Sequence, residues 1–304
     1  MPPSQQVEHP PHPWDWRTIL VLTVMHLGAL AAPFVYTPSA ALMALSLYVM
    51  SALGITLGYH RLLTHRSYRA SPWLERLIVL MGSLSFQAGP AAWVAIHRSH
   101  HARSDREGDP HSRAEGFWWS HVGWMLYLTP RRLDDSYTRR LARDILANPF
   151  YAFLDRHYFK LCLGTGWLLF ILGGWSWLVW GMFLRVALVF HATWLVNSAA
   201  HTFGYRSYAT GDRSTNCWWV ALLTMGEGWH NNHHAFPTSA RHGLRWYEFD
   251  LTWLVISGLE RAGLAWDVKL PRLETSREGG SSGSNPEPWP PLDSLTTSSD
   301  SSRT

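Results

Sequence analysis

Two long stretches without charge limit the folds open to this chain. Residues 18–60 include no Asp, Glu, Lys or Arg, and between Lys160 and Arg206 the only charged residue is Arg185. About 20 apolar residues in a helix cross the hydrocarbon core of a bilayer, so each stretch has room for two crossings. We therefore predict an all-α membrane protein with four transmembrane helices in two hairpins, at about 18–36, 40–59, 161–180 and 182–201.

The distribution of positive charge predicts the orientation of these spans. The segment from Arg61 to Lys160 carries 15 Arg or Lys residues, whereas the turns within the two stretches carry none. By the positive-inside rule, this segment and both termini face the cytoplasm. Arg185 would then lie near the far end of the fourth span, where its side chain can extend to the interface. A buried helix hairpin of a soluble protein is the alternative.

The remaining composition adds three expectations. Residues 1–16 and 275–304 are polar and rich in Pro, Ser or Gly, so both ends are expected to be disordered around a membrane domain at 17–270. Apolar residues at helical spacing over 73–85 predict an interfacial helix. Lys supplies only 2 of the 26 basic residues, and the net charge of +4 suits anionic lipids without indicating nucleic-acid binding. With only Cys162 and Cys217, neither a disulfide framework nor a thiolate metal site is supported.

Histidines gather in three short clusters. Two have the pattern His-x-x-His-His, which places three imidazoles within roughly 100° of one helix face. In the other cluster the two histidines are five residues apart, roughly 140° around an ideal helix, so they converge only if the helix ends or bends. The clusters are His60 and His65, then His97, His100 and His101, then His230, His233 and His234.

Such a set of neutral imidazoles is typical of a metal site. A structural zinc site needs four ligands, usually with cysteine, so eight histidines predict two metal ions, with Zn, Fe, Cu and Ni all plausible. Soluble di-iron carboxylate proteins use paired Glu-x-x-His motifs, but only Glu227 and His230 have this spacing. A histidine-rich two-metal site at a membrane surface points to O2 activation on a lipid substrate.

Five segments extend this interpretation to a family. GITLGYHRLLTHRSY, WVAIHRSHH, DPHSRAEGFWWSHVGW, TWLVNSAAHTFGYRSY and GEGWHNNHHAFP resemble, in the same order, motifs of the membrane-bound fatty acyl desaturases of the Δ9 (stearoyl-CoA desaturase-like and acyl-lipid) family. The resemblance covers roughly residues 17–270. It implies a cytosolic helical cap that holds a di-iron centre, and we favour the bacterial inner membrane over the endoplasmic reticulum as its location.

The resemblance also implies individual roles. Nine histidines and, through water, one asparagine would hold two Fe²⁺ ions: His60, His65, His97, His100, His101, His201, His230, His233 and His234, with Asn197. Four residues match positions that line or shape the acyl tunnel, although ordinary packing is their alternative role: Gln87, Trp93, Thr193 and Trp194.

The implied reaction is the O2-dependent introduction of a cis double bond, at Δ9, into a saturated acyl chain. Because no redox motif of its own is apparent in the chain, a separate ferredoxin or cytochrome b5-like donor is implied. The acyl carrier stays open between CoA and a glycerolipid. Residues Ala88, Ala95 and Ile96 are uncharged where acyl-CoA enzymes hold the headgroup, but Arg131 and Arg132 could bind a phosphate.

Two other functions remain as alternatives: a di-iron hydroxylase with the same centre, and a membrane haem or metal carrier without enzyme activity. Other polar residues have smaller expected roles. Asp105 and Asp109 could orient ligand imidazoles or lie in a solvated loop, and His111 and His121 could support the ligands. His26 and His191 fall inside predicted spans, where a hydrogen bond between helices is expected.

Overall fold

The computed structural model describes residues 13–128 and 135–271, and this part of the chain is mostly helical. Its α-helices are α1 (Trp16–Ala29), α2 (Pro38–Leu53), α3 (Pro72–Ser83), α4 (Pro90–Arg103), α5 (Phe117–His121), α7 (Asp135–Leu141), α8 (Arg143–Leu146), α9 (Pro149–Leu178), α10 (Arg185–Ser198), α11 (Trp218–Leu223), α12 (His230–Ala235) and α13 (Leu251–Arg261). Two π-helices, η2 (Gly54–Thr64) and η5 (Val179–Leu184), continue α2 and α9. Four short 3₁₀ segments are η1 (Ala32–Val35), η3 (Arg113–Glu115), η4 (Gly123–Met125) and η6 (Ala199–His201). Strands β1 (Arg69–Ala70) and β2 (Ala265–Trp266) form one short antiparallel pair.

Local sequence explains where the long helices begin. Thr37 and Asn148 cap α2 and α9 through their side-chain oxygens, and each is followed by a proline at the first helical position. Proline fits there because the first N–H groups of a helix have no partner within the helix. Asp250 caps α13 by accepting the N–H of Trp253 at 2.9 Å. These three helices therefore start at a sequence signal.

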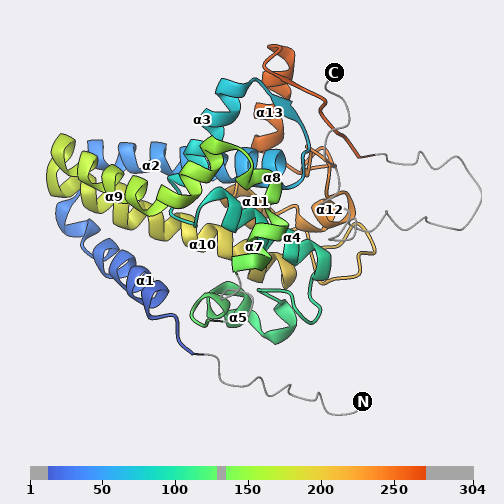
Figure 1. Cartoon of the computed structure of the whole chain (residues 1–304), viewed down its shortest axis with the longest axis horizontal. Coiled ribbons are helices and arrows are strands. Elements are labelled where there is room, and N and C mark those ends of the chain that lie inside the picture. The colour runs from blue at the N-terminus through green and yellow to red at the C-terminus, as the bar shows by residue number, and fades with distance from the viewer. Residues whose placement is uncertain (1–12, 129–134, 272–304) are drawn as a thin grey trace, which may run out of the picture.

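Two continuous helical segments are long and apolar enough to cross a membrane, at Pro38–Thr64 and Pro149–His201. The second is not straight, because Gly174 has φ 61° and ψ −152°, a conformation that residues with a Cβ rarely adopt. Figure 1 shows α10 running back beside α9 after this point. The first predicted span, 18–36, is interrupted, since α1 ends at Ala29 and the 3₁₀ segment η1 follows.

Arg185 does not have the environment that we predicted for it. Its side chain is 2% exposed, and its guanidinium donates to carbonyl oxygens of Gly181 at 2.8 Å and Leu84 at 2.6 Å and to the Ser51 hydroxyl at 3.2 Å. The expectation that it extends to the interface was therefore wrong. Neighbouring helices solvate the charge because several carbonyl oxygens and a hydroxyl converge on it.

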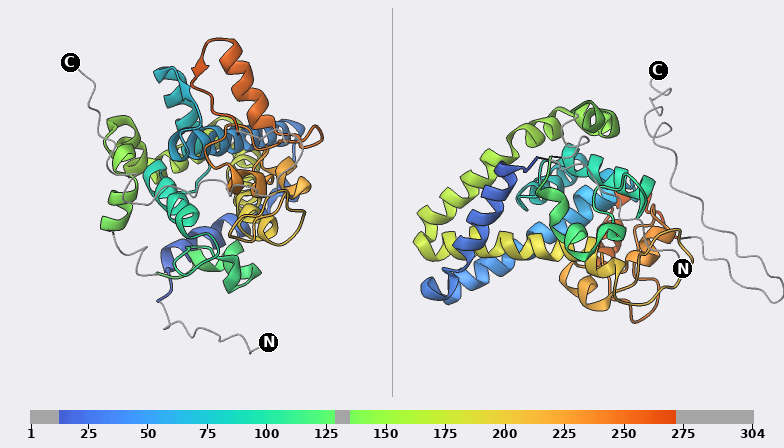
Figure 2. Two further views of the ribbon diagram at one scale, coloured as in Figure 1. Left: turned by 90° about the vertical axis from the view of Figure 1, so that its right-hand side faces the viewer. Right: turned by 90° about the horizontal axis from the view of Figure 1, so that it is seen from below.

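The long apolar helices lie at one end of the molecule, and the shorter helices, which we call the helical cap, lie at the other. Figures 1 and 2 show α1, α2, α9 and α10 together at one end, with the shorter helices gathered at the other. The helix predicted over 73–85 is α3, which packs tightly on η2: a Cβ on Gly54 would lie 2.2 Å from the backbone nitrogen of Gly82. This glycine contact lets α3 brace the segment that carries the first histidine pair.

A buried arginine joins the cap to the same segment. Arg98 of α4 is 3% exposed, pairs with Asp144 at 2.7 Å and donates to the carbonyl oxygen of Leu63 at 3.0 Å. The predicted disordered ends lie largely outside the described residues, as do Arg131 and Arg132. Within the described part, Trp14 stacks on Tyr127 with ring centroids 4.4 Å apart.

Candidate metal centre

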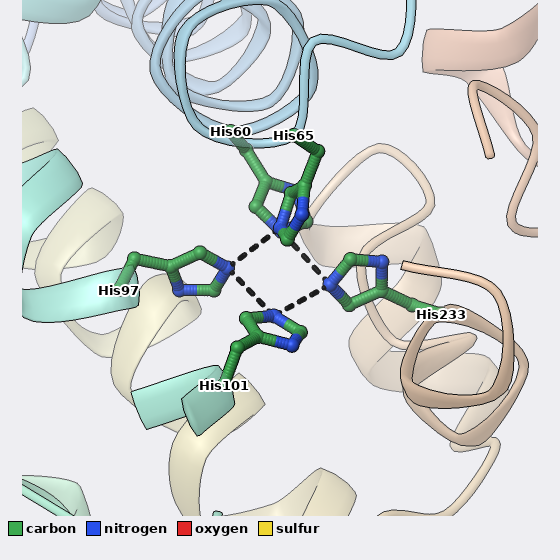
Figure 3. A group of neighbouring side chains, drawn as sticks. All are labelled: His60, His65, His97, His101 and His233. Carbon is green, nitrogen blue, oxygen red and sulfur yellow. Dashed lines mark hydrogen bonds between the residues drawn. The ribbon is translucent and has the colours of Figure 1, made fainter. Parts of the chain in front are cut away.

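The first histidine pair converges because the helix widens there. Residues 54–64 form a π-helix, and the backbone N–H of His65 donates to the carbonyl oxygen of His60 at 3.1 Å. Bonds between residues five apart define a π-helix, which often marks functional sites. In this geometry side chains five apart share a face, so His60 and His65 point into the same cluster (Figure 3).

The two His-x-x-His-His motifs are each divided between two clusters. In α4, His97 and His101 enter a first cluster, whereas His100 enters a second. The other motif divides in the opposite ratio, since His233 joins the first cluster and the pair His230 and His234 joins the second. Residues four apart are only about 40° apart on a helix, so each such pair stays together while the remaining histidine points to the other cluster.

The result is one cluster of five histidines and one of four. The five-histidine cluster comprises His60, His65, His97, His101 and His233, and the four-histidine cluster comprises His100, His201, His230 and His234. Within each, the candidate ligand atoms lie within 4.8 Å of one another. His201 comes from η6, at the end of α10, and Asn197 lies one turn before it.

The nitrogen positions fit metal ions. In the five-histidine cluster, Nε2 atoms are 2.9 Å apart for His101 and His233 and 3.1 Å apart for His65 and His97. With imidazole–metal bonds of about 2.1 Å, ligands at right angles lie roughly 3.0 Å apart and tetrahedral ligands roughly 3.4 Å apart. The observed separations are close enough for these imidazoles to share one ion.

Two buried nitrogens in the four-histidine cluster also fit an ion. Among the described residues, Nε2 of His100 and Nε2 of His234 have no hydrogen-bond partner, although both atoms are buried. A buried polar atom without a partner is costly. A metal ion would satisfy both lone pairs at once, which is the simplest explanation for their placement.

Carboxylates fix the orientation of the ligand imidazoles. Asp105 accepts from Nδ1 of His201 at 2.8 Å, and Asp109 accepts from Nδ1 of His100 at 2.9 Å, which is the first of the two roles that the sequence left open for these aspartates. Asp212 does the same for His234 at 2.6 Å. A proton held on Nδ1 leaves the Nε2 lone pair free for a metal.

The charge states agree with this assignment. Burial by itself would raise the pKa of Asp105, but the hydrogen bond and charge of His201 lower it to about 2. Burial opposes ionisation of Asp212 too, and His234 holds its pKa far below the usual range. Burial lowers the pKa of His97 and His233 well below 6.5. At neutral pH these side chains are thus carboxylates and neutral imidazoles, the forms that bind a metal.

A buried ionic network supports His60. Nδ1 of His60 lies 2.7 Å from Oε2 of Glu227, whose Oε1 accepts from Arg61 at 3.2 Å. Arg61 also pairs with Asp250 at 3.0 Å, and His242 lies 3.3 Å from Glu227. Sequence reasoning missed the roles of Arg61, Glu227, His242 and Asp250 around His60. It also missed the role of Asp212. The position of Glu227 three residues before His230 was the only local signal.

An apolar cavity borders both clusters. Its lining includes Tyr48 and Leu223 as well as His60, His97 and His230. The other lining residues are Ala52, Ile55, Thr56, Trp93, Val189, Ala192, Thr193, Val196, Asn197, Thr224 and Glu227. Such a predominantly apolar lining suits a hydrocarbon chain.

The four predicted tunnel residues have different positions. Trp93 and Thr193 line the cavity. Gln87 is not among the lining residues; its amide donates to Oγ1 of Thr193 at 2.8 Å and so holds that wall. Trp194 is 5% exposed and stacks on Phe190 with ring centroids 5.3 Å apart. It lies beside the cavity wall rather than on its surface.

Three further histidines form a separate chain of hydrogen bonds. The expected bond between helices is confirmed, because Nε2 of His26 and Nε2 of His191 are 3.1 Å apart. His191 continues through Nδ1 to His121 at 3.1 Å, and His121 bonds Ser198 at 2.9 Å. His121 therefore supports α10 rather than a cluster. His111 lies 3.9 Å from Asp109, beside His100.

Comparison with known proteins agrees with this site. A family model described as fatty acid desaturase matches residues 36–268. The sn-1 stearoyl-lipid 9-desaturase of Anabaena variabilis is 52% identical over 84% of this chain and 94% of that protein. The Synechocystis protein of the same name is 49% identical over 84% and 80%. The sn-2 palmitoyl-lipid 9-desaturase of Nostoc is 44% identical over 83% and 90%. The chain, with its paired histidine clusters, belongs to the fatty acid desaturase family.

Proposed function

We propose that the protein is an acyl-lipid Δ9 desaturase that introduces a cis double bond into a saturated acyl chain esterified to a glycerolipid. The observation that carries the proposal is the apolar cavity whose lining includes His60, His97 and His230. A chain lying in it places a methylene group against both histidine clusters. The balanced reaction is –CH2–CH2– + O2 + 2e⁻ + 2H⁺ → –CH=CH– + 2H2O.

Two iron ions are the metals we propose, held by the nine histidines, with Asn197 as the water-linked partner of the four-histidine cluster. When bound, they would supply O2 activation and the removal of hydrogen from an unactivated methylene. The protein's residues position the chain and exclude water. Trp93 and Thr193 form cavity walls beside the clusters, which fixes the carbons that face them and protects a reactive oxidant.

A glycerolipid carrier is favoured over CoA by the uncharged residues near the site. Ala95 is buried, and Ala88 follows Gln87, so these positions offer no partner for the phosphates of CoA. The three relatives are named for lipid-linked acyl chains. Their shared 9-desaturase names support the position of the double bond.

We propose four membrane crossings, with both histidine clusters on the cytosolic side of a bacterial inner membrane. The long apolar segments Pro38–Thr64 and Pro149–His201 and the break at Gly174 support the arrangement. The two electrons come from a separate ferredoxin or cytochrome b5-like protein.

The test is expression in a host without unsaturated fatty acids, followed by mass spectrometry of each lipid class. We expect a cis Δ9 bond in glycerolipid acyl chains. The His97→Ala variant should be inactive, whereas His157→Ala, a histidine of α9 outside the clusters, should retain activity. A product that gains an oxygen would identify a hydroxylase instead, and products confined to acyl-CoA would contradict the lipid carrier.

A further inference from the structure

Five arginines belong to the two segments whose aspartates bond the four-histidine cluster. Arg103, Arg106, Arg206 and Arg213 are exposed and Arg113 is half-buried. We call these five residues the arginine face. They belong to two segments, 103–113 and 206–213, that lie far apart in the sequence.

Asp105 joins the two segments. Its carboxylate accepts the backbone N–H of Arg113 at 2.9 Å and that of Arg213 at 2.8 Å. A Cβ on Gly211 would lie 3.0 Å from Nη2 of Arg106, so the Arg106 side chain reaches the second segment. Arg206 donates to the carbonyl oxygen of Asp212 at 2.6 Å. These contacts hold the two segments side by side, so the arginine face brings together residues from both.

The nearby acidic side chains do not cancel this charge. Asp105, Asp109 and Asp212 bond the imidazoles of His201, His100 and His234, so their charge faces inward. Among the exposed acids, Glu107 lies within the first segment and Glu115 lies two residues beyond it. Five positive against two negative side chains leave the outer surface positive.

The same surface is close to a metal ligand. From Arg213, one hydrogen bond of 2.8 Å leads to Asp105 and a second of 2.8 Å leads to Nδ1 of His201. Electron transfer slows steeply with distance, so a donor that binds here delivers electrons over a short path. None of the five arginines lines the acyl cavity, which argues against a role in holding the substrate headgroup.

We propose that the arginine face is the docking surface for an acidic one-electron carrier protein. The inference rests on the proposed desaturase function, which requires two electrons from outside. Opposite charge on a carrier raises its association rate, and redox partners form small, transient interfaces of this kind. The positive charge of the arginine face, which suits an acidic carrier, and the short path to His201 together favour this surface.

The experiment compares two charge reversals in the iron-loaded, full-length protein. Arg106→Glu with Arg213→Glu reverses two charges of the arginine face, and the contacts of these residues with Asp105 and Arg103 are made by backbone N–H groups that the substitutions keep. The matched control is Arg69→Glu with Arg261→Glu. Both control residues are exposed, and the pair of Arg69 with Asp267 is a surface contact of 3.5 Å that contributes little.

The measurement is anaerobic stopped-flow oxidation of a reduced acidic [2Fe–2S] ferredoxin by each oxidised protein. We expect the rate constant of the arginine-face variant to fall by about tenfold or more at low ionic strength and the difference to shrink in high salt. The control variant should stay within about twofold of the unmodified protein, since its charges lie far from the encounter surface. Iron content and reduction by photoreduced deazariboflavin, a small donor that needs no docking, should be unchanged.

Each of three kinetic results would overturn the proposal: equal slowing in both variants, no slowing in either, or slower reduction by deazariboflavin in the arginine-face variant alone. Weaker binding to vesicles of anionic phospholipid with an unchanged ferredoxin rate would also overturn it, and would assign the surface to the membrane. If neither donor reduces the unmodified protein, the desaturase function itself fails. If the donors reduce the unmodified protein normally and the charge reversal has no effect, only the proposed docking surface is ruled out and the desaturase function stands.

Discussion

Glu227 and His60 are joined by a contact of 2.7 Å between a carboxylate oxygen and Nδ1 of the imidazole. Both are buried, and Arg61, also buried, pairs with the other oxygen of the same carboxylate. A histidine of the first motif is therefore oriented by a residue next to the last motif. The positive charge of Arg61 balances the negative charge of Glu227, which allows this carboxylate to be buried beside His60.

Glu227→Gln should weaken metal binding at the five-histidine cluster. The amide is uncharged, so it attracts the His60 imidazole less strongly and leaves Arg61 with one fewer anion. Loss of a carboxylate that orients a metal ligand typically costs 10–100-fold in metal affinity, and we expect a reduction of about that size in iron titrations. Glu260→Gln, at an exposed position of α13, is the control. Unchanged iron affinity would show that Glu227 does not orient His60.

The two clusters should lose their ions separately, because they share no histidine. His65→Ala removes a ligand of the five-histidine cluster and His230→Ala one of the four-histidine cluster. In ⁵⁷Fe Mössbauer spectra we expect each variant to lose a different component and to retain about half of the iron. Loss of all iron in either variant would mean that the clusters fill cooperatively.

The bond from Gln87 to Thr193 should set the shape of the cavity wall. Gln87→Leu and Thr193→Val each break it, so their effects on KM should overlap, with a coupling of roughly 1 kcal/mol in the double variant. Iron content should stay at the level of the unmodified protein. Strictly additive effects on KM, or a loss of iron, would contradict a role confined to this wall.

Tyr48→Ala should let the enzyme accept longer acyl chains. Tyr48 lines the cavity twelve residues before His60 in the same continuous helical segment, and its hydroxyl donates to the carbonyl oxygen of Leu223 at 2.8 Å. Removal of the ring leaves room for further methylenes, each worth about 1 kcal/mol when buried. Product analysis by chain length checks this, with Ser46→Ala as a control. An unchanged profile would place the end of the chain elsewhere.

Some features of the site could be read from local spacing, and others could not. The i, i+3, i+4 pattern indicated three candidate ligands on one face. The i and i+4 members of each motif do enter the same cluster: His97 with His101, and His230 with His234. It did not indicate that each motif divides between two clusters, because this depends on where α4 and α12 cross. The five-residue spacing of His60 and His65 looked unfavourable on an α-helix and became productive only in the π-helix of η2.

The sequence by itself determined the apolar helices, their caps and the residue types that bind metal, because charge, hydropathy and capping act over a few neighbouring residues. The tertiary structure decided which histidines gather in one cluster and which carboxylates contact His60, His100, His201 and His234. Arg61 and Glu227 are 166 residues apart in the chain, and the Asp212 carboxylate meets His234 only after the segment 206–213 folds over α12. Such pairings depend on packing between distant elements, so no local pattern could predict them.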